Sequence, residues 1–112
     1  VQIACDKARS VVARLAGMDV PFYKDNEKTL AELKLRIART VAFIRSVPAQ
    51  RIDGTEDKEI VLPVTGKETR YKGMQLLFGH SMPNVYFHAT TAYNILRQNG
   101  VAIGKRDFLG QP

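Results

Sequence analysis

The chain has 112 residues, of which 45% are hydrophobic and 25% charged. These values are typical of one globular domain, and they exclude wholesale disorder and collagen-like repeats. No apolar run reaches the roughly 18 residues of a transmembrane helix, so we expect no membrane span. The single cysteine, Cys5, excludes an internal disulfide and indicates a reducing compartment, so we expect a cytoplasmic protein. The net charge of +6 favours contact with anions without identifying a partner.

The first 17 residues predict a helix. Their apolar side chains recur at helical spacing, as Ile3, Ala4, Ala8, Val11, Val12 and Leu15. Gly17 is a typical C-terminal stop. No capping residue precedes Val1, so we expect the natural N-terminal context of this helix to be missing from the sequence.

A second, longer helix is expected from a cap at Asp25 or Asn26 to the residue before Pro48. Glu32 and Arg36 stand at the spacing of an ion pair on one helix face. The predicted buried stripe is Leu30, Leu33, Ile37, Val41 and Ile44. The basic residues indicate a solvated face rather than a strip for phosphate, because no nucleic-acid recognition motif accompanies them. These are Lys34, Arg36, Arg39, Arg45 and Arg51.

The pattern then changes from helical spacing to alternation. Ile60, Leu62 and Val64 share one face of a strand, and Thr65-Gly66-Lys67 forms the expected turn. We therefore predict a β-hairpin over about residues 58–72. A two-stranded hairpin is marginal in water on its own, so this one is expected to pack against the helices.

Helical spacing returns after Gly73, with Pro83 expected to break or restart the helix. Asn84 is the candidate cap of the second part, which ends at Asn99-Gly100. Its apolar stripe is Val85, Ala89, Ala92, Tyr93 and Leu96. The tail is expected to be irregular and anchored by Ile103 and Phe108, with Lys105 and Arg106 either holding an anion or pairing with Asp107. Three long helices and one hairpin predict a mainly all-α single domain over residues 1–112, an up-and-down bundle one helix short of four.

Two histidines could carry chemistry. If the helix continues through Pro83, then His80, Asn84, His88 and Thr91 form one polar stripe. One interpretation is a metal or acid–base site in the bundle core, since imidazole binds metals and titrates near neutrality. The other, which we favour, is a hydrogen-bonded core histidine at position 88 and a surface histidine at position 80. A catalytic zinc site usually has three protein ligands, so Asp6 or Cys5 would have to supplement the histidines.

Cys5 has two interpretations as well. A reactive thiolate needs a nearby cation or helix N-terminus, and Lys7 and Arg9 point away from its face. A small buried cysteine is therefore favoured.

The segment MPNVYFHATTAYNILRQNGVAIGKRDFLG, together with VQIACDKARSVVARLAG, closely resembles an uncharacterised family. This family is catalogued as domain of unknown function nineteen-ninety-three and is related to the DinB-like superfamily. The resemblance covers nearly the whole chain, with Met82 in place of the usual leucine. It implies a DinB-like four-helix bundle that lacks its first helix in this chain. It also places the hairpin between the second and third long helices present.

The resemblance also implies a site. DinB-like relatives often bind a divalent metal through three histidines, and some are thiol-dependent enzymes. Their HxxxH pair falls on Asn84 and His88, so only the second position is a histidine, and the third ligand position falls on Gln2, Cys5 or Asp6. This implies either a degenerate zinc or nickel site at His88 or a hydrogen-bonded remnant of His88 with Asn84 and Asp6. The pocket candidates are His88, Asn84, His80, Asp6, Cys5 and Tyr93.

Two functions follow as hypotheses. The first is a metal- or thiol-dependent enzyme that uses the pocket at His88 as ligand or general base. The alternative is a non-catalytic binding or stress-associated module with a structural histidine. In that case a homodimer would cover the apolar groove left by the missing helix. Nucleic-acid binding is not expected.

Overall fold

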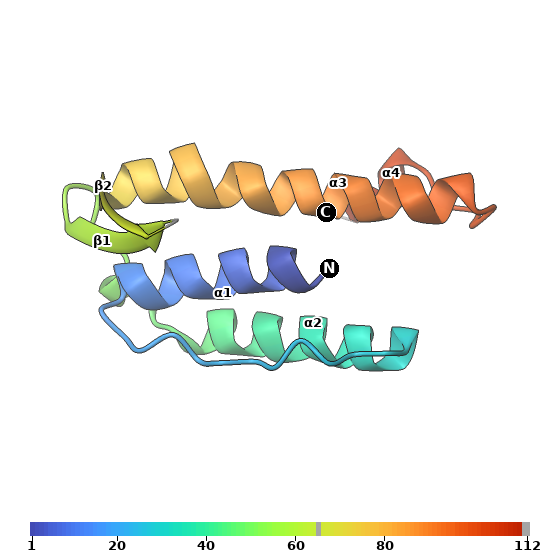
Figure 1. Ribbon diagram of the computed structural model, residues 1–112, viewed down its shortest axis with the longest axis horizontal. Helices are drawn as coiled ribbons and strands as arrows, with labels where there is room; N and C mark the ends of the chain where they lie inside the picture. Colours follow the sequence, from blue (N-terminus) through green and yellow to red (C-terminus); the bar gives the residue numbers. More distant parts are fainter. Residues whose placement is uncertain (65, 111–112) are drawn as a thin grey trace.

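The computed structural model describes residues 1–64 and 66–110. Its three long helices are α1 (Gln2–Leu15), α2 (Leu30–Ser46) and α3 (Met82–Gln98). The hairpin of β1 (Glu59–Val64) and β2 (Lys67–Lys72) lies between α2 and α3 in the chain, as predicted (Figure 1). The fold also contains short elements, namely η1 (Ala49–Arg51), a π-helical segment η2 (Gln75–Ser81) and α4 (Lys105–Leu109). Thr65, expected in the hairpin turn, lies outside the described residues.

Helix α1 is the centre of the arrangement. It packs against both α2 and α3, which lie on either side of it (Figure 1). The radius of gyration is 15.3 Å. A compact domain of this length would have about 13 Å. The molecule is therefore more open than a closed bundle, and α2 and α3 each keep one face away from α1.

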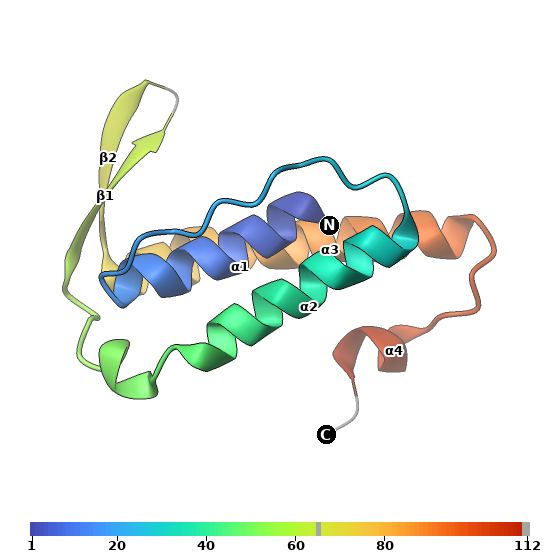
Figure 2. The same ribbon diagram turned by 90° about the horizontal axis from the view of Figure 1, so that it is seen from below.

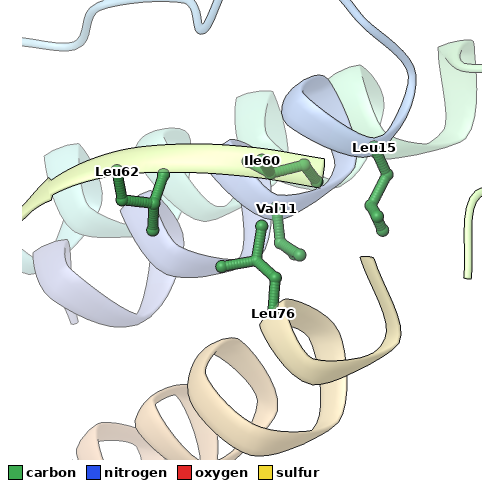
Figure 3. Packing of buried hydrophobic residues seen from close by; sticks show 5 residues of the cluster. All are labelled: Val11, Leu15, Ile60, Leu62 and Leu76. Carbon is green, nitrogen blue, oxygen red and sulfur yellow. The ribbon is translucent and has the colours of Figure 1, made fainter. Parts of the chain in front are cut away.

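The apolar core lies at one end of the molecule, where α1 meets the hairpin and η2. Its buried members are Val11, Leu15, Ile60, Leu62 and Leu76 (Figure 3). Ile60 and Leu62 are buried while Val61 between them is exposed, so the predicted alternation of β1 is confirmed for these residues. The strands pair antiparallel, with Ile60 opposite Tyr71 and Leu62 opposite Thr69. The hairpin rises from this core, away from the helices (Figure 2).

Helix α2 begins later than predicted. Its N-cap is Thr29, whose side chain accepts a hydrogen bond from the Glu32 backbone while the Glu32 carboxylate accepts from the Thr29 backbone. This reciprocal capping box satisfies two donors that would otherwise lack partners at the helix start. The predicted caps Asp25 and Asn26 are therefore wrong. So is the Glu32–Arg36 pair, because Glu32 is used in the cap.

The predicted buried stripe of α2 is also wrong in part. Leu30, Ile37 and Val41 are exposed, whereas Arg36 and Thr40 are buried. The period of the apolar residues is helical, but α1 packs against the adjacent face. The apolar face of α2 is consequently left open.

Segment η2 continues directly into α3. Pro83 lies in the first turn of α3, where a missing N–H is tolerated, so it does not break the helix. Asn84 is not a cap; its side-chain amide donates to the His80 carbonyl. The predicted stop is confirmed, with Gly100 in the left-handed region at φ 85°. None of the residues of α3 is buried.

The tail forms a short helix, not the irregular segment predicted. The Asp107 carboxylate accepts a hydrogen bond from the Gly104 backbone N–H and so caps α4. Asp107 is used in this cap, so the pairing expected with Lys105 or Arg106 is not formed among the described residues. The Phe108 ring lies edge-on to Tyr93 at 5.8 Å, which confirms Phe108 as an anchor.

Gly73 joins the hairpin to η2 at a point of close backbone approach. A Cβ atom at this position would lie 1.9 Å from the Thr55 carbonyl oxygen. Gly73→Ala is therefore expected to destabilise the fold by about 1–3 kcal/mol, as overpacking does. Urea unfolding measures this. Gly79→Ala, where nothing lies within 4 Å of the added methyl group, is the matched control and is expected to be neutral or stabilising.

Candidate functional site

A large apolar groove lies between α2 and α3. Its volume is about 750 Å³, and helix α1 forms its floor through Ala4, Cys5 and Ala8. The small floor residues leave room between the taller side walls. The α2 wall consists of Ile37, Thr40, Val41 and Ile44, and the α3 wall of Val85, Tyr86, Ala89, Ala92, Tyr93 and Leu96. Ile103, Asp107 and Phe108 line it from the C-terminal segment.

The polar side chains of the groove are largely engaged elsewhere. The Thr40 hydroxyl donates to the Arg36 carbonyl, and the Tyr93 hydroxyl accepts a hydrogen bond from Arg97. The Asp107 carboxylate caps α4. Cys5 is buried, as predicted. The groove is therefore suited to bind an apolar surface, and these contacts assemble no acid–base pair within it.

The two histidines lie in separate surroundings. The Lys7 ammonium lies 3.4 Å from Nε2 of His80, which belongs to η2. The His80 ring centroid lies 5.5 Å from that of Tyr71. Burial, and then the charges of Lys7 and Arg14, lower the pKa of His80. His88 is half-buried, with its ring edge-on to Phe87. Both histidines are half-buried, so the favoured prediction of a core histidine at position 88 and a surface histidine at position 80 is wrong, and the two rings do not meet at one site.

Asp6 belongs to a different cluster, centred on Arg36. The guanidinium of Arg36 lies 2.8 Å from the Asp6 carboxylate, and 2.7 Å from each of the Asp25 and Glu27 carboxylates. It also donates to the Lys24 carbonyl at 3.1 Å. The Arg36 side chain is only 2% exposed. The expected remnant of His88 with Asn84 and Asp6 is not formed, because Asp6 and Asn84 have these other partners.

An aromatic ring extends this cluster. Tyr23 lies between two guanidinium groups, that of Arg9 at 3.9 Å from the ring centroid and that of Arg39 at 4.3 Å. Arg9 also pairs with Asp6 at 2.7 Å. Together these contacts hold the strap, residues 18–29, against α1 and α2. Figure 2 shows this segment running beside α1 toward the start of α2. The cluster positions α2, and a small pocket of about 220 Å³ beside it is lined by Tyr23, Glu27, Arg36 and Arg39 among others.

The strap is expected to weaken in acid. Hydrogen bonds from Gln2 and Arg36 lower the pKa of Glu27 to about 2 from an ordinary value of 4.5. Because the folded pKa lies below the unfolded one, the stability that Glu27 contributes is complete above pH 4.5 and is lost as the pH falls to about 2. The unfolding free energy of Glu27→Gln is therefore expected to depend less steeply on pH than that of the unchanged protein across this range. Parallel curves would contradict the assignment.

A divalent metal of the kind implied by the resemblance does not fit these residues. Across residues 1–64 and 66–110, no three His, Cys, Asp or Glu side chains are grouped closely enough to hold an ion. Asp6 is bound by two guanidinium groups, and His80 and His88 have separate neighbours. The donor set for a three-ligand site is therefore not assembled among the described residues.

Comparison with known proteins identifies the family of the chain. Residues 1–109 match the family described as Domain of unknown function (DUF1993). The chain belongs to this family. It is also similar to a crystal structure of a DinB family member protein from Shewanella denitrificans, with a TM-score of 0.88 and 42% sequence identity. The match covers 99% of the present chain and 63% of that chain, so the chain spans less than two thirds of this relative. No curated protein matches it.

In the DUF1993 chain, the sequence identified some residues of the groove and missed the charge cluster. Cys5 and Tyr93 both line the groove, whereas the other candidates do not. Arg36 was expected on a solvated face and is instead buried, because its partners Asp6, Asp25 and Glu27 come from α1 and from the irregular strap. No local spacing signals such a cluster. A buried arginine is recognised only once the strap and α1 are placed beside α2. Within the described ranges, no helix has the length and apolar character to cross a membrane.

Proposed function

We propose that this DUF1993 chain is a non-catalytic binding module whose groove accepts one face of an amphipathic helix. The observation that carries this proposal is the apolar lining of the groove on three helices at once. Side chains such as Tyr86, which is 55% exposed, and Ile37, which is 43% exposed, otherwise lie open to water. Contiguous apolar patches of more than a few hundred Å² are rare on monomers and mark interaction sites.

A helix is the occupant that the shape favours. The groove runs between two helices of 17 residues each, and α1 supplies a floor of small side chains. Small floor residues allow close approach of another helix about 10 Å in diameter. Such an occupant would bridge α2 and α3 and complete a four-helix arrangement. Recognition of an amphipathic helix by an apolar groove is a recurrent mode of peptide binding.

A blocked groove tests the proposal. The probe is a fluorescently labelled helical peptide with a leucine face and glutamine on its other positions, and binding is followed by fluorescence anisotropy. Ala4→Trp places a large ring on the groove floor and is expected to weaken binding by about tenfold or more, the equivalent of about 1.4 kcal/mol. Ala31→Trp, at an exposed position of α2 that does not line the groove, is the matched control and is expected to bind as the unchanged protein does.

Two results would count against this function. One is the absence of peptide binding to the unchanged protein. The other is equal weakening by Ala4→Trp and Ala31→Trp. Circular dichroism melts of both variants show whether each is folded at the temperature of the binding experiment. A second copy of the chain is another occupant that an apolar groove allows, and sedimentation of the protein alone detects it.

A further inference from the structure

We propose that Lys7, Arg14 and His80 bind a phosphate group where η2 packs against α1. The site lies apart from the groove, so it goes beyond the proposed function and does not depend on it. Three features of the molecule support it: the register of η2 on α1, the charges that meet there, and the lack of a carboxylate beside them.

The packing of η2 on α1 brings Lys7 and His80 together. Segment η2 continues into α3, which runs antiparallel to α1 (Figure 1), and Leu76 shares the apolar core with Val11. Lys7 stands four residues before Val11, and His80 stands four residues after Leu76. The Lys7 Nζ and His80 Nε2 atoms are 3.4 Å apart. The buried leucine therefore fixes the place of this contact, on a π-helical segment of a kind that is frequent at functional sites.

A second cation lies on the same side of α1. Arg14 follows Lys7 by seven residues, or about two helical turns, so both stand on one face of the helix. That face is roughly 200° around the helix axis from Cys5, which belongs to the floor of the groove. Neither Lys7 nor Arg14 lines the groove. Any helix seated in the groove would therefore lie on the other side of α1 from these two cations.

The two cations have no carboxylate partner. Within residues 1–64 and 66–110, neither Lys7 nor Arg14 forms an ion pair. The sequence gives the reason. Helix α1 contains no acidic residue after Asp6, and no Asp or Glu occurs from residue 69 to residue 106, the range that includes η2 and α3. The two elements that meet here therefore bring positive charge without its compensation.

Burial makes this arrangement unusual. Lys7, Arg14 and His80 are all half-buried, and burial lowers the pKa of Arg14. An ammonium group can only donate, so His80 Nε2 accepts from Lys7 and the ring is neutral. Burial, followed by the charges of Lys7 and Arg14, lowers the pKa of His80. Titratable groups that are desolvated and placed beside specific charges mark functional sites, and here the missing charge is negative.

A phosphate group suits these three donors better than a carboxylate does. The Arg14 guanidinium alone satisfies a carboxylate through two parallel hydrogen bonds. A phosphate has oxygens for the guanidinium, for the Lys7 ammonium and for His80 once its Nε2 is protonated. The Tyr71 ring packs against the apolar core and lies 5.5 Å from the imidazole, so it supports His80 from the hairpin side. Bound phosphate would thus convert His80 from a neutral acceptor into a charged donor.

Nuclear magnetic resonance of the histidine rings tests this site. The chain has two histidines, and His88 serves as the internal control. Inorganic phosphate, glycerol 3-phosphate and acetate are each added at a constant ionic strength set with sodium chloride. Phosphate is expected to bind at least about tenfold more tightly when His80 is protonated, so the pKa of His80 rises while that of His88 does not. Acetate is expected to leave both unchanged.

Two double variants locate the effect. Lys7→Gln/Arg14→Gln is expected to abolish the response to phosphate. In buffer without phosphate it is expected to raise the pKa of His80, because the two cations that lower it are gone. Lys34→Gln/Arg45→Gln removes the same charge from exposed positions of α2 and is expected to respond as the unchanged protein does.

Each outcome bears on the phosphate site. A stronger response to glycerol 3-phosphate assigns it to the phosphate group of a larger molecule, and a stronger response to inorganic phosphate assigns it to the free ion. An equal response of His80 to acetate and phosphate, or no response to either phosphate, would overturn the site. So would a full response in Lys7→Gln/Arg14→Gln. The comparison of anions uses the unchanged protein, so it does not depend on how the variants fold.

Discussion

Replacing Arg36 with methionine is expected to destabilise the fold by about 3 kcal/mol. Removal of one member of a buried ion cluster leaves the remaining charges without compensation, which costs about 3–5 kcal/mol for a fully buried pair. The lower end applies because Asp6 and Asp25 keep some access to water, with side-chain exposures of 36% and 57%. The Glu27 side chain is only 11% exposed, so of the three carboxylates it is the one most destabilised when the arginine is removed. Methionine retains much of the aliphatic volume, so the effect reports on charge rather than on a cavity.

Urea unfolding of matched variants measures this effect. Arg39→Met is the control, because Arg39 is exposed and contacts the same Tyr23 ring without pairing with a buried carboxylate. Its loss is expected to be about 0.5–1 kcal/mol, the usual value of an exposed cation–π contact. Glu27→Gln should lower the free energy of unfolding less in the Arg36→Met variant than in the unchanged protein, since the partner of Glu27 is already absent there. Equal losses for Arg36→Met and Arg39→Met would show that the cluster does not hold α2.

Arg36 also explains where sequence reasoning failed. The apolar residues of α2 repeat with a helical period, and the period is correct. Periodicity locates an apolar face but does not say what covers it. In this fold α1 packs against the face of Arg36 and Thr40, because the carboxylates of α1 and the strap neutralise the guanidinium there. The face with Ile37 and Val41 is left to form the wall of the groove.

The features that the sequence alone predicted correctly depend either on a few neighbouring residues or on a long segment that resembles a known family. The alternation of Ile60 and Leu62 identified the hairpin, and Gly17 and Gly100 marked the ends of two helices with positive φ. The family resemblance was confirmed over residues 1–109. The helix start at Thr29 was missed because several capping residues lie close together, and only the bond to Glu32 decides among them.

The charge cluster and the groove are two consequences of one orientation of α2. Ion pairs fix the rotation of this helix about its own axis, since Arg36 has to face Asp6 and Glu27. That rotation directs Ile37, Val41 and Ile44 toward the space above Ala4 and Ala8. Loss of the cluster is therefore expected to impair helix binding without any change to a groove residue, and the Arg36→Met variant can be examined with the same peptide.

Leu76→Ala is the second substitution with a large expected effect, about 3 kcal/mol. Leu76 is 1% exposed and lies among Val11, Ile60 and Leu62, so it joins η2 to both α1 and the hairpin (Figure 3). Truncation of a buried leucine removes apolar contacts and leaves a cavity, for a typical loss of about 2–5 kcal/mol. Leu109→Ala removes the same atoms from a side chain that is 68% exposed and is expected to change stability by no more than about 0.5 kcal/mol.

The region of the fold that loses stability in Leu76→Ala is as informative as the size of the loss. A two-stranded hairpin is at best marginally stable in water, so β1 and β2 depend on the core beneath them. In Leu76→Ala, amide hydrogen exchange in the hairpin is therefore expected to accelerate more than exchange in the part of α1 that faces α2. The two regions would then open separately, as independent units of a fold do. Uniform acceleration in both regions would show instead that the hairpin and the helices unfold as one unit, and that the core under the hairpin also supports the groove.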